Sequence, residues 1–354
     1  MSKLRRNDQG MKFTKTNTFY VIFLVIRIAF LVLSLFLAVG LGTVNIPFTD
    51  TYKIIIGKTF HIESLYEGIR KSTISIVFDR RVPRVLLGLF AGAGLSLCGA
   101  VRQSTVNNPI AEPYILGVSS GATFGATLII ALGLAKAVSL GSFLGAVAAT
   151  FLVRGIASHK GKRTATRLIL SGTVVNALFT AFSNFVISVF ASSDSIADIK
   201  FWTMGSLASA SYQGLIIPAV VVILSSAFFL TQGKTRNTRR LGDETAISLG
   251  VNLSVYRIIY RSIVALLTGV LVASCGIIGF VGLIIPHIVR GLVGTNHKKV
   301  LPLSMVIGSL FLIWADVLAR TLVKNAELPI GIFTALVGAP FFIYIVVKKN
   351  YAKE

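Results

Sequence analysis

RVLLGLFAGAGLSLCG at residues 84–99 returns, in altered form, as RSIVALLTGVLVASCG at residues 261–276. Arg, Gly, Cys and Gly occupy the same places in both stretches, at offsets of 0, 8, 14 and 15 residues. Each stretch lies in an apolar window long enough to cross a bilayer as a helix, which takes about 20 residues. An internal repeat of this kind predicts that the chain contains two copies of one structural unit.

The composition of the chain indicates a membrane environment. Of its 354 residues, 54% are hydrophobic and only 14% are charged, and the mean hydropathy is +0.80. Soluble domains are typically about 45–50% apolar and about 25% charged, so the composition excludes a soluble enzyme and a disordered chain. Cys98 and Cys275 both lie inside apolar runs, which excludes a disulfide scaffold and a zinc site built on paired cysteines.

Ten apolar windows of spanning length follow one another along the chain. They lie at residues 19–42, 83–103, 113–135, 138–157, 167–191, 212–232, 257–275, 277–296, 300–323 and 328–347. We therefore expect an all-α, polytopic membrane protein with about ten transmembrane helices at 19–347, between tails at 1–18 and 348–354. The repeated stretches fall in the second and seventh windows and thus cross in opposite directions, as in an inverted repeat.

Glycines mark the places where helices are expected to break or to touch. Gly276, Gly279, Gly282 and Pro286 interrupt the apolar stretch shared by the seventh and eighth windows, and they favour a turn or a broken helix there. Elsewhere glycines four residues apart share one helix face, where two backbones can approach closely; they are Gly88 and Gly92, Gly117, Gly121 and Gly125, and Gly141 and Gly145.

The formal net charge of +22 is distributed unevenly over the two sides of this arrangement. With ten spans, the side of the N-terminus receives roughly twice as many Lys and Arg residues as the other side, which matches the positive-inside rule. Both termini are therefore predicted to be cytoplasmic in a cell membrane, and the longest loop, at 43–82, to be external. The basic charge needs no nucleic-acid partner to explain it.

Several polar strings interrupt the apolar windows. Residues 103–113 form a turn broken by two prolines, in which a well-capped loop is one interpretation. Residues 241–252 indicate a short cytoplasmic helix, suited either to docking in a partner's groove or to the membrane surface. Asp316 and Arg320 are four residues apart, so an ion pair within one helix is expected, and the lone His287 favours a structural role.

Taken together, these strings resemble the permease subunits of bacterial ABC importers for iron–siderophore complexes, haem and cobalamin. The resemblance covers most of residues 81–342 and rests on RVPR at 81–84, on Gln103 to Gly117, and on three later motifs at 241–251, 279–290 and 316–331. Ile110 stands where the family usually has Leu, and residues 1–80 carry little of the pattern.

The resemblance implies a dimer of ten-span subunits, either homo- or heterodimeric, with two cytoplasmic ATPase subunits and an extracytoplasmic substrate-binding protein. No cofactor or metal site is expected in this chain, because ATP and Mg would lie on the ATPase. The Gly233-Lys234-Thr235 string lacks the glycine that a phosphate-binding loop needs five residues earlier, where Phe228 stands.

Three groups of site residues follow from the resemblance. Arg81, Arg84 and Arg320, at outer helix ends, are expected to meet carboxylates of the binding protein, with anchoring to lipid headgroups as the alternative. The helix that couples to the ATPase is expected to contain Gly242, Asp243, Glu244, Ala246, Leu249 and Gly250.

The third group is the substrate pathway between two permease subunits. Its cytoplasmic exit is expected at Asn108 and Ile110 and around Thr164 and Thr166. Its wall is expected on the fifth span, whose uncharged polar residues are Ser171, Thr173, Asn176, Thr180, Ser183 and Asn184. Hydrogen bonding between helices of one subunit is the alternative role for these side chains.

The predicted function is the permease of an ATP-driven importer that moves a ferric-siderophore-type metal chelate into the cytoplasm, with no catalytic residue in this chain. A haem or cobalamin importer of the same family is the alternative. A channel or an ion-coupled secondary transporter would place more ionisable groups at the membrane midplane. An intramembrane enzyme would need a constellation of catalytic groups that Asp316 and His287 do not make.

Overall fold

The structure, a computed structural model, describes residues 17–106, 117–158, 165–232, 253–323 and 326–351. These ranges are helical and contain no strand. Ten of their helices coincide with the ten expected windows, which confirms the predicted fold class. They are α1 (Asn17–Gly40), α4 (Val82–Val106), α5 (Val118–Ala131), α6 (Val138–Ser158), α7 (Ala165–Phe190), α9 (Tyr212–Thr231), α12 (Leu253–Cys275), α13 (Val281–Val293), α14 (His297–Thr321) and α15 (Ile330–Tyr351).

Seven helices of the described chain are long and apolar enough to cross a membrane, and α5, α13 and α15 contribute shorter apolar segments. The expected break between the seventh and eighth windows is confirmed. α12 ends at Cys275, Gly276 takes a positive φ of 68°, and α13 begins only at Val281. A residue with a Cβ would be strained at Gly276, which explains the glycine at this turn.

The stretch at 43–82 was expected to be an external loop between the first two spans, and the structure shows that this connection is largely helical. It contains α2 (Phe48–Phe60), the 3₁₀ turn η2 (Glu63–Leu65), α3 (Lys71–Ser75) and the π-helical segment η3 (Ile76–Arg81), which runs into α4. Thr51, Ile54 and Gly57 lie on one face of α2 and are buried, so this mixed-charge stretch folds by covering the bundle.

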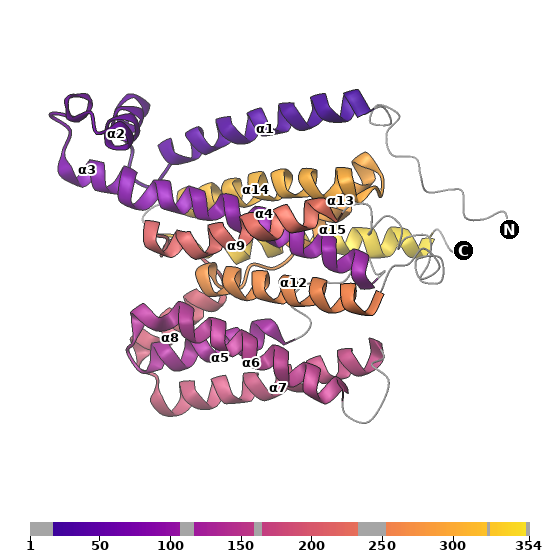
Figure 1. The fold of residues 1–354 in the computed structure, drawn as a ribbon. Helices are drawn as coiled ribbons and strands as arrows, with labels where there is room; N and C mark the ends of the chain where they lie inside the picture. The colour runs from indigo at the N-terminus through magenta and orange to yellow at the C-terminus, as the bar shows by residue number, and fades with distance from the viewer. Residues whose placement is uncertain (1–16, 107–116, 159–164, 233–252, 324–325, 352–354) are drawn as a thin grey trace.

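The two ends of the bundle differ in what they carry. Figure 1 shows α1 beginning and α15 ending at one end, while α2, α3 and α8 (Ser193–Thr203) lie at the other. This agrees with the even number of crossings expected from the sequence. We refer below to the end with α2, α3 and α8 as the α8 end.

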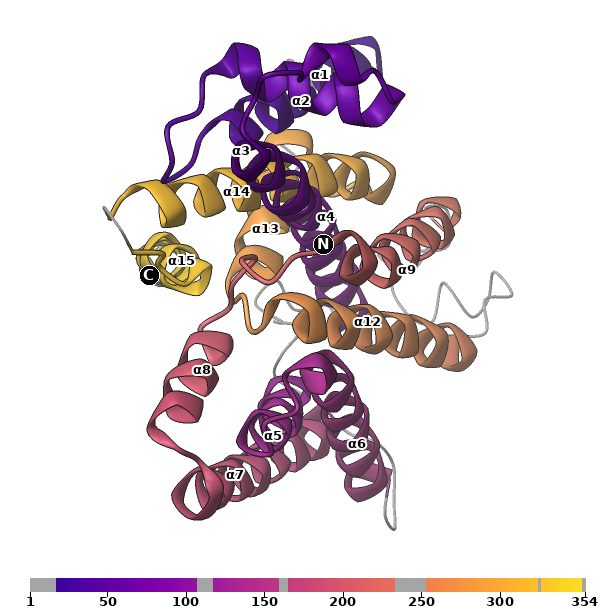
Figure 2. The same ribbon diagram turned by 90° about the vertical axis from the view of Figure 1, so that its left-hand side faces the viewer.

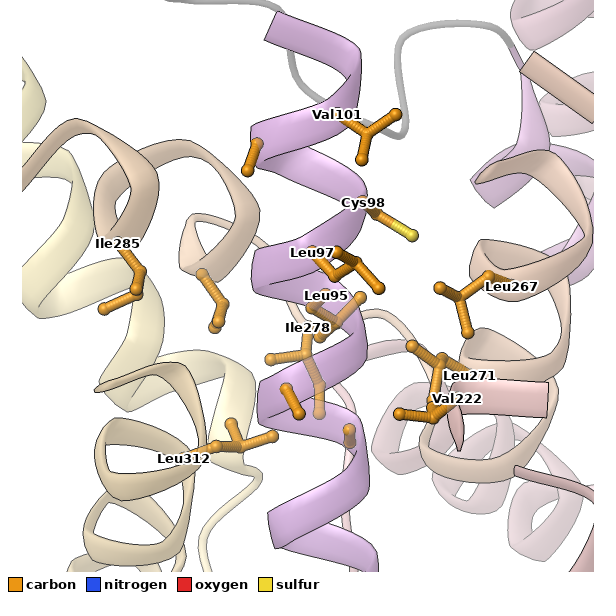
Figure 3. Close-up of a cluster of buried hydrophobic side chains, with 14 of the residues drawn as sticks. Leu95, Leu97, Cys98, Val101, Val222, Leu267, Leu271, Ile278, Ile285 and Leu312 are labelled. Atoms are coloured by element: carbon orange, nitrogen blue, oxygen red, sulfur yellow. The ribbon is translucent and has the colours of Figure 1, made fainter. Parts of the chain in front are cut away.

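α4 is the central helix of the molecule. Figure 2 shows it amid α9, α12, α13 and α14, with α5, α6 and α7 gathered on the far side of α12. In the close-up of Figure 3, Leu95 and Leu97 of α4 lie in a cluster with Leu271 of α12 and Leu312 of α14, all of them buried. Lipid is as apolar as leucine, so close packing rather than escape from water holds such helices together.

The two copies of the repeated pattern pack against each other in opposite directions. Gly94 of α4 faces Leu271 of α12, whereas the Cys98 Sγ, one turn further along α4, lies 3.8 Å from the carbonyl oxygen of Val264. Moving forward along α4 thus means moving backward along α12. In addition, α4 packs on α14 while α12 packs on α6, which are the corresponding helices of the two halves.

The expected close approach at glycines occurs between α5 and α6. A Cβ at Gly121 would collide with the backbone of Gly145, and one at Gly125 would collide with the backbone of Gly141. α4 and α14 meet in the same way at Gly92 and Gly308. Glycine at these positions is therefore required by the distance between the helix backbones.

Candidate functional site

Three arginines and two carboxylates gather at the α8 end, and we call them the arginine–carboxylate cluster: Arg81, Arg84, Asp316, Arg320 and Glu327. The Arg84 Nε lies 2.9 Å from the Asp316 Oδ1, and the Arg84 Nη1 donates to both Glu327 carboxylate oxygens, at 2.9 and 3.0 Å. The Arg320 Nε lies 3.4 Å from the Asp316 Oδ2. The expected pair of Asp316 and Arg320 is confirmed, and Arg84 extends it to a second helix.

Two of these arginines also hold the end of α1. The Arg81 Nη1 donates to the carbonyl oxygens of Val39 and Gly40, and the Arg320 Nη2 donates to that of Ala38 at 2.6 Å. The last carbonyls of a helix have no partner within the helix, and they carry partial negative charge. Arg81 and Arg320 therefore cap α1 and tie it to α4 and α14.

These contacts bear on the expected role of the three arginines. Arg81, Arg84 and Arg320 are 5%, 8% and 3% exposed. Docking by these groups would need the guanidinium groups to be presented to a partner. They are not presented in this structure, because α1, Asp316 and Glu327 engage them, so docking stays a prediction. The alternative of anchoring to lipid headgroups is equally unsupported by their burial.

A second feature is an open polar cavity of about 420 Å³, lined mainly by residues of α5, α7 and α8. Its lining is dominated by hydroxyl and amide side chains. They are Ser119, Ser120, Thr123, Thr127, Asn176, Thr180, Ser183, Asn184 and Thr203, together with Ile187, Ile196, Ile199, Ile277 and Lys200. We refer to this feature as the polar cavity.

α7 presents one polar face to this cavity. Asn176, Thr180 and Asn184 follow each other at four-residue spacing and thus share one side of the helix, and all three are exposed in the isolated chain. Uncharged polar groups on a spanning helix are unfavourable against lipid, so this face is suited to a protein partner or to water. Ser171 differs, because its hydroxyl is buried and donates to the Arg167 carbonyl oxygen of the same helix.

Two motif residues far apart in the sequence meet at the other end of α4. The Gln103 side-chain nitrogen donates to the carbonyl oxygens of Gly282 and Leu283, at 3.1 and 3.2 Å, and Arg290 donates to the Gln103 side-chain oxygen. Gln103 thus secures the first turn of α13 against α4. This contact gives a structural reason for the glutamine in the motif at 103–117 and the arginine in the motif at 279–290.

The remaining expected site residues lie mainly outside the described residues. These are Asn108, Ile110 and Thr164 of the predicted exit, and Gly242, Asp243, Glu244, Ala246, Leu249 and Gly250 of the predicted coupling helix. Thr166 falls in the first turn of α7. Among the described residues, no group of three His, Cys, Asp or Glu side chains is placed to hold a metal ion.

α8 was not expected from the sequence, and neither were its four residues of the cavity wall, Ile196, Ile199, Lys200 and Thr203. The signals for this helix are present in the sequence. The Ser192 hydroxyl accepts a hydrogen bond from the Ser195 amide at 3.2 Å, Asp194 lies in the first turn and Lys200 in the last. Such a cap and charge order is typical of a helix, but a helix of 11 residues is too short to appear as a spanning window.

Comparison with known proteins identifies relatives over nearly the whole chain. The pattern of the FecCD transport family matches residues 30–348. The iron(3+)-hydroxamate import system permease protein FhuB of Bacillus subtilis (strain 168) is 35% identical over 348 residues, which cover 97% of this chain and 87% of that protein. The molybdate import system permease protein MolB of Haemophilus influenzae is 35% identical over 324 residues, covering 90% of this chain and 93% of that protein.

A solved structure has the same fold. It is described as an inward-facing conformation of a metal-chelate type ABC transporter. The two structures agree with a TM-score of 0.79 at 32% sequence identity, over 93% of this chain and 100% of the other.

Proposed function

The chain belongs to the FecCD transport family, and from this membership we propose that it is the permease subunit of an ATP-driven importer that carries a ferric-siderophore-type chelate into the cytoplasm. As a multi-pass membrane permease it performs translocation. The substrate is the part of this proposal that family membership leaves open, because relatives are named for cargoes as different as iron(3+)-hydroxamate and molybdate.

The observation that carries the proposal is the polar cavity beside the exposed face of α7. A chelate is too bulky to pass through the packed core around α4, whereas a seam between two subunits can widen by rigid-body movement. The face formed by Asn176, Thr180 and Asn184 supplies such a seam with uncharged polar groups. These groups can hydrogen-bond to water in the passage and bind a passing ligand only weakly.

The energy for transport is proposed to come from two cytoplasmic ATPase subunits, which bind ATP and Mg. Residues 242–251 are proposed as the helix seated in the ATPase. An extracytoplasmic binding protein would deliver the chelate at the α8 end, which is opposite to the end where α1 begins and α15 ends. Both termini are then cytoplasmic.

Docking of the binding protein at Arg81 can be tested separately from folding. Charge reversal at Arg81 should weaken the stimulation of ATPase activity by the binding protein. Replacing the binding-protein carboxylate that faces Arg81 by Lys should partly restore this stimulation. Arg80, the exposed neighbour of Arg81, provides the control for a change of charge alone. Unchanged stimulation in a folded Arg81→Glu variant would reject docking at this residue and leave it the role of capping α1.

The transport proposal is tested by reconstituting the permease with its ATPase and binding protein in lipid vesicles. Uptake of a radiolabelled iron(III) chelate should require ATP at the ATPase and should persist when ion gradients are collapsed. Uptake that follows a proton or sodium gradient without ATP would identify a secondary transporter instead. Uptake of haem or cobalamin in place of iron chelates would keep the mechanism and change the cargo.

A further inference from the structure

The charge on the lining of the polar cavity is of one sign. Fourteen of the described side chains line the cavity, and Lys200 is the only ionisable one among these fourteen. No carboxylate of the described residues belongs to the lining. One cation among hydroxyl and amide groups, with no carboxylate beside it on the described lining, favours a guest with negative charge.

The helix that carries Lys200 separates its charges by face. Ile196, Ile199, Lys200 and Thr203 share the side of α8 that lines the cavity, at spacings of three and four residues. Asp194 and Asp198 lie on the same helix and are exposed, but they are not part of the lining. Within the described chain, no carboxylate oxygen lies within 4 Å of the Lys200 ammonium, so its charge is available.

Lys200 is carried by a helix that is capped at its start and joined to two other helices at its end. The Ser192 hydroxyl caps the start of α8. Just past its end, Ser206 donates its amide to the Cys275 carbonyl oxygen at 2.9 Å, and the Ile330 amide donates to the Gly205 carbonyl oxygen at 2.9 Å. α8 is thus joined to the end of α12 and the start of α15, and its position relative to the cavity is set before a ligand arrives.

We propose that the polar cavity binds negatively charged metal chelates and that the Lys200 ammonium recognises their charge. The inference rests on the proposed function and narrows its substrate class, because uncharged chelates would gain nothing from Lys200. The ammonium acts as a point charge that needs no fixed geometry. The surrounding hydroxyl and amide groups hydrogen-bond to the chelate without adding a second charge, which keeps binding weak enough for release.

Protection of a single cysteine tests the inference on the purified permease. Ile196 lies one turn before Lys200 on the same face, about 5–6 Å away between Cβ atoms, and it is replaced by Cys in a Cys98→Ala/Cys275→Ala background. An uncharged thiol reagent labels this cysteine in the presence of either ferric citrate, which is anionic, or an uncharged iron(III) trihydroxamate. The concentration of each chelate that halves the labelling rate is measured.

Lys200→Gln should raise the half-protecting concentration of ferric citrate about fivefold. This is the effect expected when one unit charge in contact with the chelate is lost from a water-exposed site. The same variant should change the half-protecting concentration of the uncharged chelate less than twofold. Lys200→Arg should leave the half-protecting concentrations of both chelates unchanged. Lys136→Gln removes an exposed lysine from the α5–α6 connection, outside the cavity, and should change neither.

Equal protection by the two chelates, no protection by ferric citrate, or an unchanged value in Lys200→Gln would overturn the inference. The assay needs neither ATPase nor binding protein, so its result stands even if ATP-driven uptake fails. Conversely, ATP-driven uptake without charge-selective protection would reject the role of Lys200 and leave the proposed transport function intact.

Discussion

Asp316 is the residue on which the α8 end of the bundle depends. It is 2% exposed and lies between the guanidinium groups of Arg84 and Arg320. A buried ion pair adds little net stability, because desolvation of both partners offsets their attraction, but removal of one partner leaves an uncompensated charge. Arg320 and Arg81 hold the end of α1 as well, so loss of Asp316 affects three helices.

Replacing Asp316 by Ala is therefore expected to destabilise the permease strongly, by about 3–5 kcal/mol. The buried thiols of Cys98 and Cys275 make the measurement simple, because a thiol-reactive dye becomes fluorescent only when unfolding exposes them. The midpoint of thermal unfolding in detergent should fall by several degrees in Asp316→Ala. Asp79→Asn, which changes an exposed carboxylate of η3, should leave the midpoint within about one degree; a similar midpoint for both variants would contradict this account.

Sequence spacing could predict only part of this cluster. The pair of Asp316 and Arg320 follows from helical geometry, because residues four apart are neighbours on any helix. Arg84 and Glu327 are separated by 243 positions, so their bond depends on how the segment between α14 and α15 lies against α4, which a single sequence does not specify. For the same reason the sequence could not show that Arg81 and Arg320 are engaged by carbonyl groups of α1.

Spanning helices could be predicted well from sequence and short helices could not. The ten windows follow from the length of apolar runs that a bilayer requires, and Asn176, Thr180 and Asn184 stand out because polar residues are rare in such runs. α2 and α8 obey no such length requirement. Their amphipathic patterns are short, and the tertiary contacts at the α8 end decide their structure. The four residues of the polar cavity that lie on α8 were therefore not predicted.

The contact between α5 and α6 provides a test of backbone packing. A Cβ at Gly125 would meet the backbone carbonyl of Gly141, and a main chain cannot yield as a flexible side chain can. Gly125→Ala is expected to cost about 1–3 kcal/mol, as overpacking does. Gly155→Ala is the matched control, because a Cβ at Gly155 meets nothing within 4 Å.

Thermal unfolding with the thiol dye measures both glycine variants. The midpoint should fall for Gly125→Ala and should stay the same or rise slightly for Gly155→Ala, since alanine favours a helix by up to about 1 kcal/mol over glycine. Equal midpoints for the two variants would mean that α5 and α6 can separate without cost.

The proposed coupling helix at 242–251 gives a prediction for assembly with the ATPase. Its small residues would allow close approach to a groove, and a bulky side chain at Ala246 should prevent that approach. Ala246→Trp is expected to uncouple ATP hydrolysis from transport while the permease stays folded, as judged by an unchanged unfolding midpoint. Normal assembly and normal uptake with Ala246→Trp would place the interface elsewhere.

The polar face of α7, rather than low burial alone, indicates where a second copy would bind. The most apolar window of the span that contains α4 is 83% buried, whereas that of α7 is 22% buried and that of α1 is 11% buried. α7 carries both exposed apolar side chains, such as Val174 and Phe185, and the polar face that lines the cavity. One side of α7 is thus suited to lipid and another to a seam between subunits.

Single cysteines on α7 test this arrangement, in a background from which Cys98 and Cys275 have been removed. Asn176→Cys on the polar face should react with a water-soluble, membrane-impermeant thiol reagent or cross-link between subunits, and its rate should change with the nucleotide bound to the ATPase. Val174→Cys is 60% exposed in the isolated subunit but lies off the polar face, so it should resist the reagent in lipid. Ser171→Cys should also resist, because Ser171 is buried within the subunit.

This pattern of reactivity separates a pathway from hydrogen bonding inside one subunit. A pathway predicts reaction at Asn176 and, through the cytoplasmic exit, at Asn108, in each case dependent on nucleotide. Bonding between helices of one subunit predicts that both positions stay inert. Complete inertness at Asn176 and Asn108 in every nucleotide state would reject the route along α7, because a substrate larger than the reagent cannot pass where the reagent does not enter.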